Sequence, residues 1–192
     1  MLTITDLPTD IHDTIAAFLP DKDLIDFVCA SRQIVVSPYL LRQRQRAYWK
    51  KHTAIYLTIK GDLAGLQYLH GCGGLKMDLA IMNVASCNGH LAVVQFLHGI
   101  GATCTAETMD FAAYKGHMAV VQFLHSTGVT CTTQAMDWAS SNGHLAVVQF
   151  LHSIGASFTD YAMNHAANEG HLAVVEFLHS IGAPLFDWWR KS

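Results

Sequence analysis

The sequence predicts an all-α protein, in which a three-helix N-terminal segment precedes an α-solenoid of about five short helix-turn-helix repeats. The main observation is a ten-residue motif, Gly-His-(Leu/Met)-Ala-Val-Val-(Gln/Glu)-Phe-Leu-His, that occurs four times at an interval of 27 residues, beginning at Gly89, Gly116, Gly143 and Gly170. Such a period indicates units that stack on their neighbours, because one short helical pair cannot bury a core alone. The composition, 51% hydrophobic and 14% charged, is typical of a folded chain. Residues 1–50 do not repeat, which divides the chain into segments 1–50 and 51–192.

The N-terminal segment carries the start and stop signals of three short helices. Pro8 opens a run of apolar residues with helical spacing that stops at Pro20, and either Asp21 or Asp23 can cap the next helix. Pro38 then opens a third helix that extends to about residue 49, since proline is favoured in the first turn. We therefore expect three helices in close succession.

The residues of this segment resemble an F-box. The resemblance rests on Leu-Pro-x-Asp-Ile-x-x-x-Ile-x-x-Phe-Leu-Pro-x-x-Asp-Leu, which begins at Leu7, and on Phe-Val-Cys-x-Ser-Arg, which ends at Arg32. F-boxes dock onto the Skp-type adaptor of cullin-RING ubiquitin ligases, so the resemblance implies an adaptor-binding surface. The residues that would form or support this surface are Leu7, Pro8, Ile11, Ile15, Leu19 and Leu24.

The F-box pattern has one departure, and the segment has a second interpretation. Members of the family often have Trp or Phe just after the Cys-x-x-Arg stretch, where this chain has Gln33 and Ile34. In the second interpretation the three helices cap the exposed hydrophobic end of the solenoid, as terminal elements of repeat arrays must. The two roles are compatible with each other.

Comparison of the four repeats, position by position, separates each first helix into a uniform face and a variable face. Seven, four and three residues before the motif glycine, every repeat has methionine, alanine, and either alanine or serine. At about 100° per residue these positions share one side of a helix, so we expect them in the core. The positions five, two and one before the glycine vary among the repeats and lie on the opposite face. They hold Val84, Cys87, Asn88, Phe111, Tyr114, Lys115, Trp138, Ser141, Asn142, His165, Asn168 and Glu169.

Each repeat also has recognisable helix ends. The first helices should begin after residues whose side chains can cap an N-terminus, namely Asp78, Thr105, Thr132 and Thr159. The second helices should end where a glycine can take the left-handed C-cap conformation, namely near Gly101, Gly128, Gly155 and Gly182. Residues 53–80 form a weaker first copy, in which Asp62 replaces the motif histidine, so we expect five helical pairs.

This unit resembles an ankyrin repeat. It shares the pattern Ala-(Ala/Ser)-x-x-Gly-His-x-x-Val-Val-x-x-Leu-x-x-x-Gly-Ala across about residues 53–188. A Met-(Asp/Asn) pair replaces the usual Thr-Pro-Leu-His, and the period falls six residues short of the usual 33 or so. The segment from Ala102 to Thr105 is too short for the β-hairpin finger of that family, so we expect an array without fingers. A chain that combines an F-box with repeats of this kind resembles proteins encoded by giant DNA viruses of amoebae, such as pandoraviruses, and by their hosts.

The histidine ladders do not predict a metal site. Packed helices lie about 8 to 10 Å apart, whereas zinc holds nitrogen ligands at about 2 Å, so equivalent histidines of adjacent repeats are too far apart to share an ion. We expect the Gly-His histidines to hydrogen-bond loop backbone and the Leu-His histidines to pack between repeats. The sequence has no hydrolase, metalloprotease or phosphate-binding motif. We therefore expect a non-catalytic protein without a cofactor or metal.

Composition and charge narrow the location and the partners. No apolar run approaches the 18 or so residues of a membrane span, and the N-terminus lacks a signal-peptide profile, which favours the cytoplasm or nucleus. Five cysteines without a Cys-x-x-Cys pair indicate reduced thiols. The formal net charge of −3 argues against a general nucleic-acid binder. The one basic cluster is more typical of a solvated helix face than of a phosphate-binding surface, and it consists of Arg42, Arg44, Arg46, Lys50 and Lys51.

These observations predict a protein-interaction adaptor, monomeric on its own. In the main hypothesis it is the substrate receptor of a Skp-cullin-F-box ubiquitin ligase, whose N-terminal helices bind the adaptor while the variable face binds a target. The expected target-binding residues are Val84, Asn88, Phe111, Tyr114, Lys115, Trp138, Ser141, Asn142, His165, Asn168 and Glu169. The alternative is a scaffold that acts without a ligase and sequesters a host protein.

Overall fold

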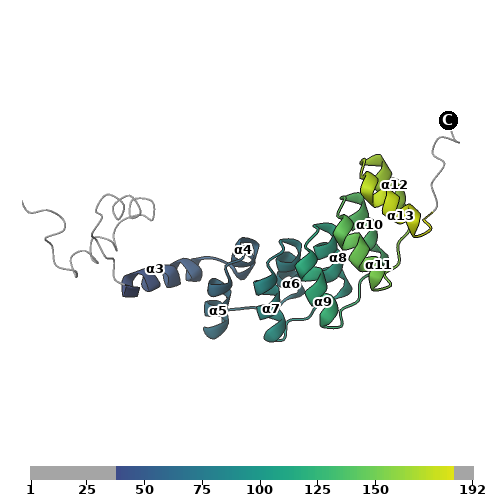
Figure 1. Ribbon diagram of the computed structural model, residues 1–192. Helices are drawn as coiled ribbons and strands as arrows, with labels where there is room; N and C mark the ends of the chain where they lie inside the picture. The colour runs from purple at the N-terminus through teal and green to yellow at the C-terminus, as the bar shows by residue number, and fades with distance from the viewer. Residues whose placement is uncertain (1–37, 184–192) are drawn as a thin grey trace, which may run out of the picture. The chain divides into compact units, whose positions relative to one another are not determined.

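The computed structural model describes residues 38–183, and this part of the chain consists of helices α3 to α13 with no strand (Figure 1). The chain divides into two units, Met1–Thr53 and Ala54–Ser192. The first two predicted helices and the F-box-like positions lie outside the described residues. The sequence also predicts that Pro184, Leu185, Phe186, Trp188 and Trp189 cover the last helical pair as a C-terminal cap, and these residues lie outside the described part as well.

The one described helix of the first unit is α3 (Pro38–Lys51). It confirms the predicted third helix and begins at the proline that fixes a helical φ angle in the first turn. Lys50 and Lys51 occupy the last turn, where positive charge interacts favourably with the helix dipole. Together with Arg46 they are exposed, in agreement with a solvated basic face.

The second unit contains five helical pairs, which confirms the predicted number. In each pair the helix before the Gly-His turn is the first helix and the helix after it is the second. The pairs are α4 (Ala54–Lys60) with α5 (Leu63–Gly71), α6 (Leu79–Cys87) with α7 (Leu91–Gly99), α8 (Ala106–Tyr114) with α9 (Met118–Ser126), α10 (Thr133–Ser141) with α11 (Leu145–Ser153), and α12 (Asp160–Asn168) with α13 (Leu172–Ser180).

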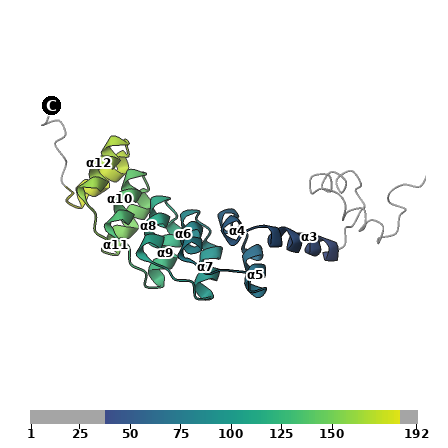
Figure 2. The same cartoon turned by 180° about the vertical axis from the view of Figure 1, so that it is seen from behind.

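The pairs stack in sequence order into two layers, one of first helices and one of second helices. Figures 1 and 2 show α6, α8, α10 and α12 side by side in one layer and their partners in the other. The first helices pack on one another more closely than the second helices do. The small residues of the uniform face explain this close approach. The links between repeats, such as Ala102 to Thr105, are short and non-helical, so the described array has no fingers, as predicted.

The core consists of the predicted uniform face together with the apolar stripe of the second helices. Every methionine and alanine at the two uniform positions is buried, as are nearly all the valines and the leucine of the repeated Val-Val-x-x-Leu pattern. The third uniform position is buried in three repeats, but Ala167 in the last described repeat is exposed because no further repeat covers it among the described residues. The hydroxyls of Ser86 and Ser140 are buried at this position and have no hydrogen-bond partner in the described part of the chain.

The helix ends follow the predicted capping residues. Asp78, Thr105, Thr132 and Thr159 are the N-caps of α6, α8, α10 and α12. The Asp62 carboxylate caps α5 by accepting a hydrogen bond from the Gly65 amide at 2.9 Å. The predicted C-terminal glycines all have φ between 80° and 91°, in the left-handed region that favours glycine, and they are Gly101, Gly128, Gly155 and Gly182.

Buried aspartates join the repeats of α8 and α10 to the repeats that follow them. The Asp110 carboxylate accepts hydrogen bonds from the Thr132 amide at 3.0 Å and from the Thr132 hydroxyl at 2.7 Å. Asp137 binds Thr159 in the same way at 2.8 and 2.7 Å. These aspartates belong to the Met-(Asp/Asn) pair that replaces Thr-Pro-Leu-His. The replacement is therefore a clamp, in which a carboxylate on one first helix holds the N-cap of the next.

The Gly-His histidines form a second link between repeats and confirm the predicted backbone hydrogen bond. His90 Nε2 donates to the Ile59 carbonyl, and His117 Nε2 donates to the Cys87 carbonyl, both at 3.0 Å. The ring of His117 also lies against Gly89 of the preceding repeat, 2.5 Å from where a Cβ would stand. The motif glycine is therefore required both for its positive φ and for the space that the next histidine occupies.

The Leu-His histidines pack between repeats, as predicted. In each case the imidazole meets the phenylalanine of the following second helix edge to face, with ring centroids 5.7 to 5.9 Å apart. The four pairs are His70 with Phe96, His98 with Phe123, His125 with Phe150, and His152 with Phe177. This geometry places the positive edge of one ring on the negative face of the other.

Candidate functional site

Three aromatic side chains of the variable face form a cluster across α8 and α10. Trp138 stacks on Phe111 with centroids 6.1 Å apart and an interplanar angle of 24°. It also meets Tyr114 edge to face at 5.8 Å. Phe111 and Tyr114 lie one helical turn apart on α8, and Trp138 is half-buried against both. Trp138 therefore packs on the preceding repeat's first helix, which fixes its position at the surface.

The cluster forms one wall of a cavity of about 590 Å³ at the C-terminal ends of the first helices. The residues that line the cavity come from α8, α10 and α12, from the C-caps of α10 and α12, and from the N-cap of α13. The residues that line it are Tyr114, Trp138, Ser141, Asn142, Tyr161, Glu169 and His171. Five of these seven belong to the predicted target-binding set, so the structure brings that part of the set together around one concave surface.

The remaining predicted target-binding residues lie on the same face but outside the cavity. Phe111 stacks against Trp138, and Lys115 lies over the Tyr114 ring with its Nζ 4.8 Å from the centroid. Val84 and Asn88 lie near the N-terminal end of the array, where the Asn88 amide donates to the Val84 carbonyl at 2.8 Å. The other two predicted residues are on α12 and do not line the cavity, and they are His165 and Asn168.

Sequence reasoning missed two of the residues that line the cavity, Tyr161 and His171. Tyr161 stands nine residues before a motif glycine, a position held by Ala80, Glu107 and Gln134 in the other repeats. This variation is the same signal that identified the variable face, one turn closer to the helix start. His171 belongs to the constant motif, and nothing in its sequence distinguishes it from the other Gly-His histidines. It lines the cavity from the N-cap of α13, and its ring lies against Gly143 of the preceding repeat.

The cavity lies in a part of the chain with negative net charge, and the cation near it is Lys115, over the Tyr114 ring. Residues 54–183 contain three lysines, no arginine and eight carboxylates, which gives a formal net charge of −5 with neutral histidines. Glu169 supplies the carboxylate at the cavity itself. Burial lowers the pKa of His144, and a hydrogen bond to the backbone of Tyr114 only partly opposes this, so the neutral imidazole is favoured there.

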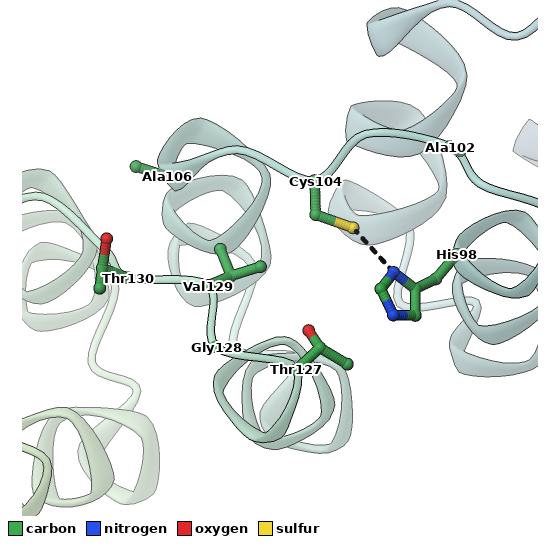
Figure 3. A pocket seen from close by; sticks show the side chains of 8 residues that line it. All are labelled: His98, Ala102, Cys104, Ala106, Thr127, Gly128, Val129 and Thr130. Atoms are coloured by element: carbon green, nitrogen blue, oxygen red, sulfur yellow. Dashed lines mark hydrogen bonds between the residues drawn. The ribbon is translucent and has the colours of Figure 1, made fainter.

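A second, smaller cavity of about 390 Å³ lies between the second and third helical pairs, and a cysteine and a histidine lie beside each other in it (Figure 3). The Cys104 thiol points toward His98, with Sγ 3.9 Å from Nδ1. Burial raises the pKa of Cys104, so the thiol is protonated at neutral pH and is not an activated nucleophile. No group of three or more metal-binding side chains occurs among residues 38–183.

Comparisons with known proteins agree with this geometry. Residues 109–152 match the family model described as ankyrin repeats (many copies). The crystal structure of the human ASB11 ankyrin repeat domain is similar to the array, with a TM-score of 0.61, 18% sequence identity, and coverage of 69% of this chain and 70% of that one. The array has the ankyrin-repeat fold. No curated protein sequence matches the chain significantly.

The ankyrin-repeat fold indicates a protein–protein interaction module, and it is typically a scaffold without catalysis. This fits a variable face whose aromatic side chains are held in place and partly open to solvent. In the part of the chain that the structure describes, no helix has the length and apolar character needed to cross a bilayer.

Proposed function

We propose that the protein is the substrate receptor of a Skp-cullin-F-box ubiquitin ligase, with the ankyrin repeats binding the protein to be modified. The observation that supports the target-binding half is the cavity beside the cluster of Phe111, Tyr114 and Trp138. Tryptophan and tyrosine dominate binding hot spots, and truncating such a residue costs about 2 kcal/mol or more of binding. The adaptor-binding half rests on the F-box-like residues between Leu7 and Arg32.

The target-binding half is tested by placing a long side chain at the cavity. Asn142→Arg introduces an arginine at an exposed position of the cavity rim, whereas Gln149→Arg introduces the same group at an exposed position on α11, in the other layer. Quantitative affinity capture with the full chain should lose its partner with the first variant and keep it with the second. Equal capture of the partner by both variants would show that the target binds at another surface of the protein.

The adaptor-binding half is tested separately. The double change Leu7→Ala and Pro8→Asp should abolish co-purification of the full chain with a Skp-type adaptor, while Glu176→Gln on α13 should leave it unchanged. Unchanged adaptor binding by the double variant would contradict the F-box assignment.

The alternative function is a ligase-independent scaffold that sequesters a host protein. It predicts target capture that depends on Asn142 but no adaptor in the captured complex, so the two experiments above separate the functions. In either case we expect a monomer in the cytoplasm or nucleus, and in the host cell if the chain is viral, without a nucleic-acid, membrane or cofactor partner.

A further inference from the structure

The composition of the larger cavity is that of a site for a positively charged side chain. Three of its seven lining residues are aromatic, namely Tyr114, Trp138 and Tyr161. The face of an aromatic ring carries negative charge density, and it attracts an ammonium or guanidinium group within about 6 Å of its centre. A neutral apolar ligand would use the same rings, so the aromatic residues alone leave the charge of the ligand open.

The packing of the cluster directs the open side of the indole toward the cavity. Phe111 covers one face of Trp138, and Tyr114 meets it edge to face. Since Trp138 is half-buried and lines the cavity, the part of the ring that remains accessible is on the cavity side. Tyr161 also lines the cavity, is 43% exposed and stacks one face on His165 with ring centroids 3.6 Å apart, which limits its movement.

One of these rings, that of Tyr114, already contacts a cation of the chain itself. The Lys115 ammonium lies over the Tyr114 ring at 4.8 Å from the centroid, although the side chain is exposed and free to extend into solvent. The same arrangement occurs at the N-terminal end of the array, where Lys60 lies over Tyr56 at 5.9 Å. Tyr114 therefore presents an electron-rich face that a cation occupies even without a partner.

The polar groups of the cavity select for positive charge. Glu169 is its one carboxylate, in an array with a formal net charge of −5. The Asn142 amide nitrogen donates to the Trp138 carbonyl at 2.8 Å, and the amide oxygen can accept a hydrogen bond from an incoming donor. An exposed ion pair alone contributes little, so the selectivity requires the carboxylate and the aromatic faces to act on the same group.

We propose that this cavity binds a lysine or arginine side chain of the target protein. The proposal rests on the proposed function, that the variable face binds a protein, and adds the chemistry of the residue it recognises. Cationic side chains should bind about fivefold or more tightly than neutral side chains of the same shape.

The test is a nuclear magnetic resonance titration of the ¹⁵N-labelled full chain with short blocked peptides. The probes are Ac-Ala-Arg-Ala-NH₂, the same peptide with citrulline, which has the shape of arginine without its charge, and the same peptide with glutamate. The arginine peptide should shift the signals of the Trp138 indole and the Ser141 and Asn142 amides. Glu169→Gln should weaken its binding several-fold, and Glu176→Gln, which makes the same change on the exposed face of α13, should not.

The outcomes separate this proposal from the proposed function. Equal shifts with citrulline and arginine, preferential binding of glutamate, or equal effects of Glu169→Gln and Glu176→Gln would overturn the preference for a cation. Absence of shifts with the arginine peptide at tens of millimolar would overturn it as well. Target capture that still depends on Asn142 would then leave the protein-binding function standing, because that experiment does not depend on the charge of the ligand.

Discussion

Replacing Asp110 with alanine tests whether the clamp between first helices stabilises the array. Asp110 is 1% exposed and accepts two hydrogen bonds from Thr132, at 3.0 and 2.7 Å. A hydrogen bond to a charged group contributes about 1.5 to 3 kcal/mol, but Asp110 is also desolvated, which offsets part of this. Its raised pKa has burial as the largest cause, ahead of the opposing bonds from Thr132.

We expect Asp110→Ala to lower the free energy of unfolding by about 2 kcal/mol, because Thr132 is near the surface and water can replace part of what is lost. Asp110→Asn should cost less, since Asn83 occupies the same repeat position and accepts from the Thr108 hydroxyl at 2.7 Å. Urea unfolding of the full chain, followed by far-ultraviolet circular dichroism, measures both. Asp160→Ala removes an exposed carboxylate at the start of α12 and serves as the control, with a loss of about 0.5 kcal/mol. A loss from Asp110→Ala no greater than that of the control would refute the clamp.

Three further predictions concern the repeat contacts. Gly116→Ala should destabilise more than Gly128→Ala in urea unfolding, because both glycines have positive φ but only the Cβ at Gly116 would meet the His144 ring, at 2.6 Å; equal losses would argue against the histidine contact. The pKa of His144 is lowered below its ordinary 6.5, so the native state binds fewer protons than the unfolded state just below that pH. Stability should therefore be fully present above pH 6.5 and decrease as the pH falls through the folded pKa, and the decrease should be smaller in His144→Gln. Ser140→Ala should raise the free energy of unfolding by about 1 kcal/mol in the same assay, because it removes a buried hydroxyl without a partner among the described residues, and Ala113 already fills the equivalent position.

The features of the fold that sequence comparison predicted are those whose cause is local or strictly periodic. Thr132 caps its own helix, Gly101 ends its own helix, and Met109 recurs on one helical face. Each depends on neighbours within one turn or on a repeat that every copy shares. Stacking the copies then determines the two layers, because only one face of each helix is apolar.

The contacts between repeats and the cavity could not be predicted, because they depend on how neighbouring repeats are spaced. The Asp110 carboxylate meets Thr132, which lies 22 residues further on and in another repeat, so the Met-Asp pair has no local explanation. The cavity has the same origin. Tyr161 and Trp138 line one cavity because α10 and α12 stack with a particular offset, and that offset depends on contacts between repeats, such as the bond of Thr159 to Asp137, that have no local signal in the sequence.

The two links between repeats give the array a direction. A repeat supplies the aspartate and the glycine on its C-terminal side, and it supplies the threonine and the histidine on its N-terminal side, as Asp110, Gly116, Thr132 and His144 illustrate. The copies of α8 and α10, which carry all four residue types, can therefore follow one another without a change in the joint, whereas the copy of α6 has Asn83 in place of the aspartate and bonds Thr108. A duplicated unit of 27 residues carries both halves of each joint with it, so a gene could lengthen or shorten this array in whole units while its variable face changes freely. The residues that bind a target can therefore change while the contacts that stabilise the fold stay the same.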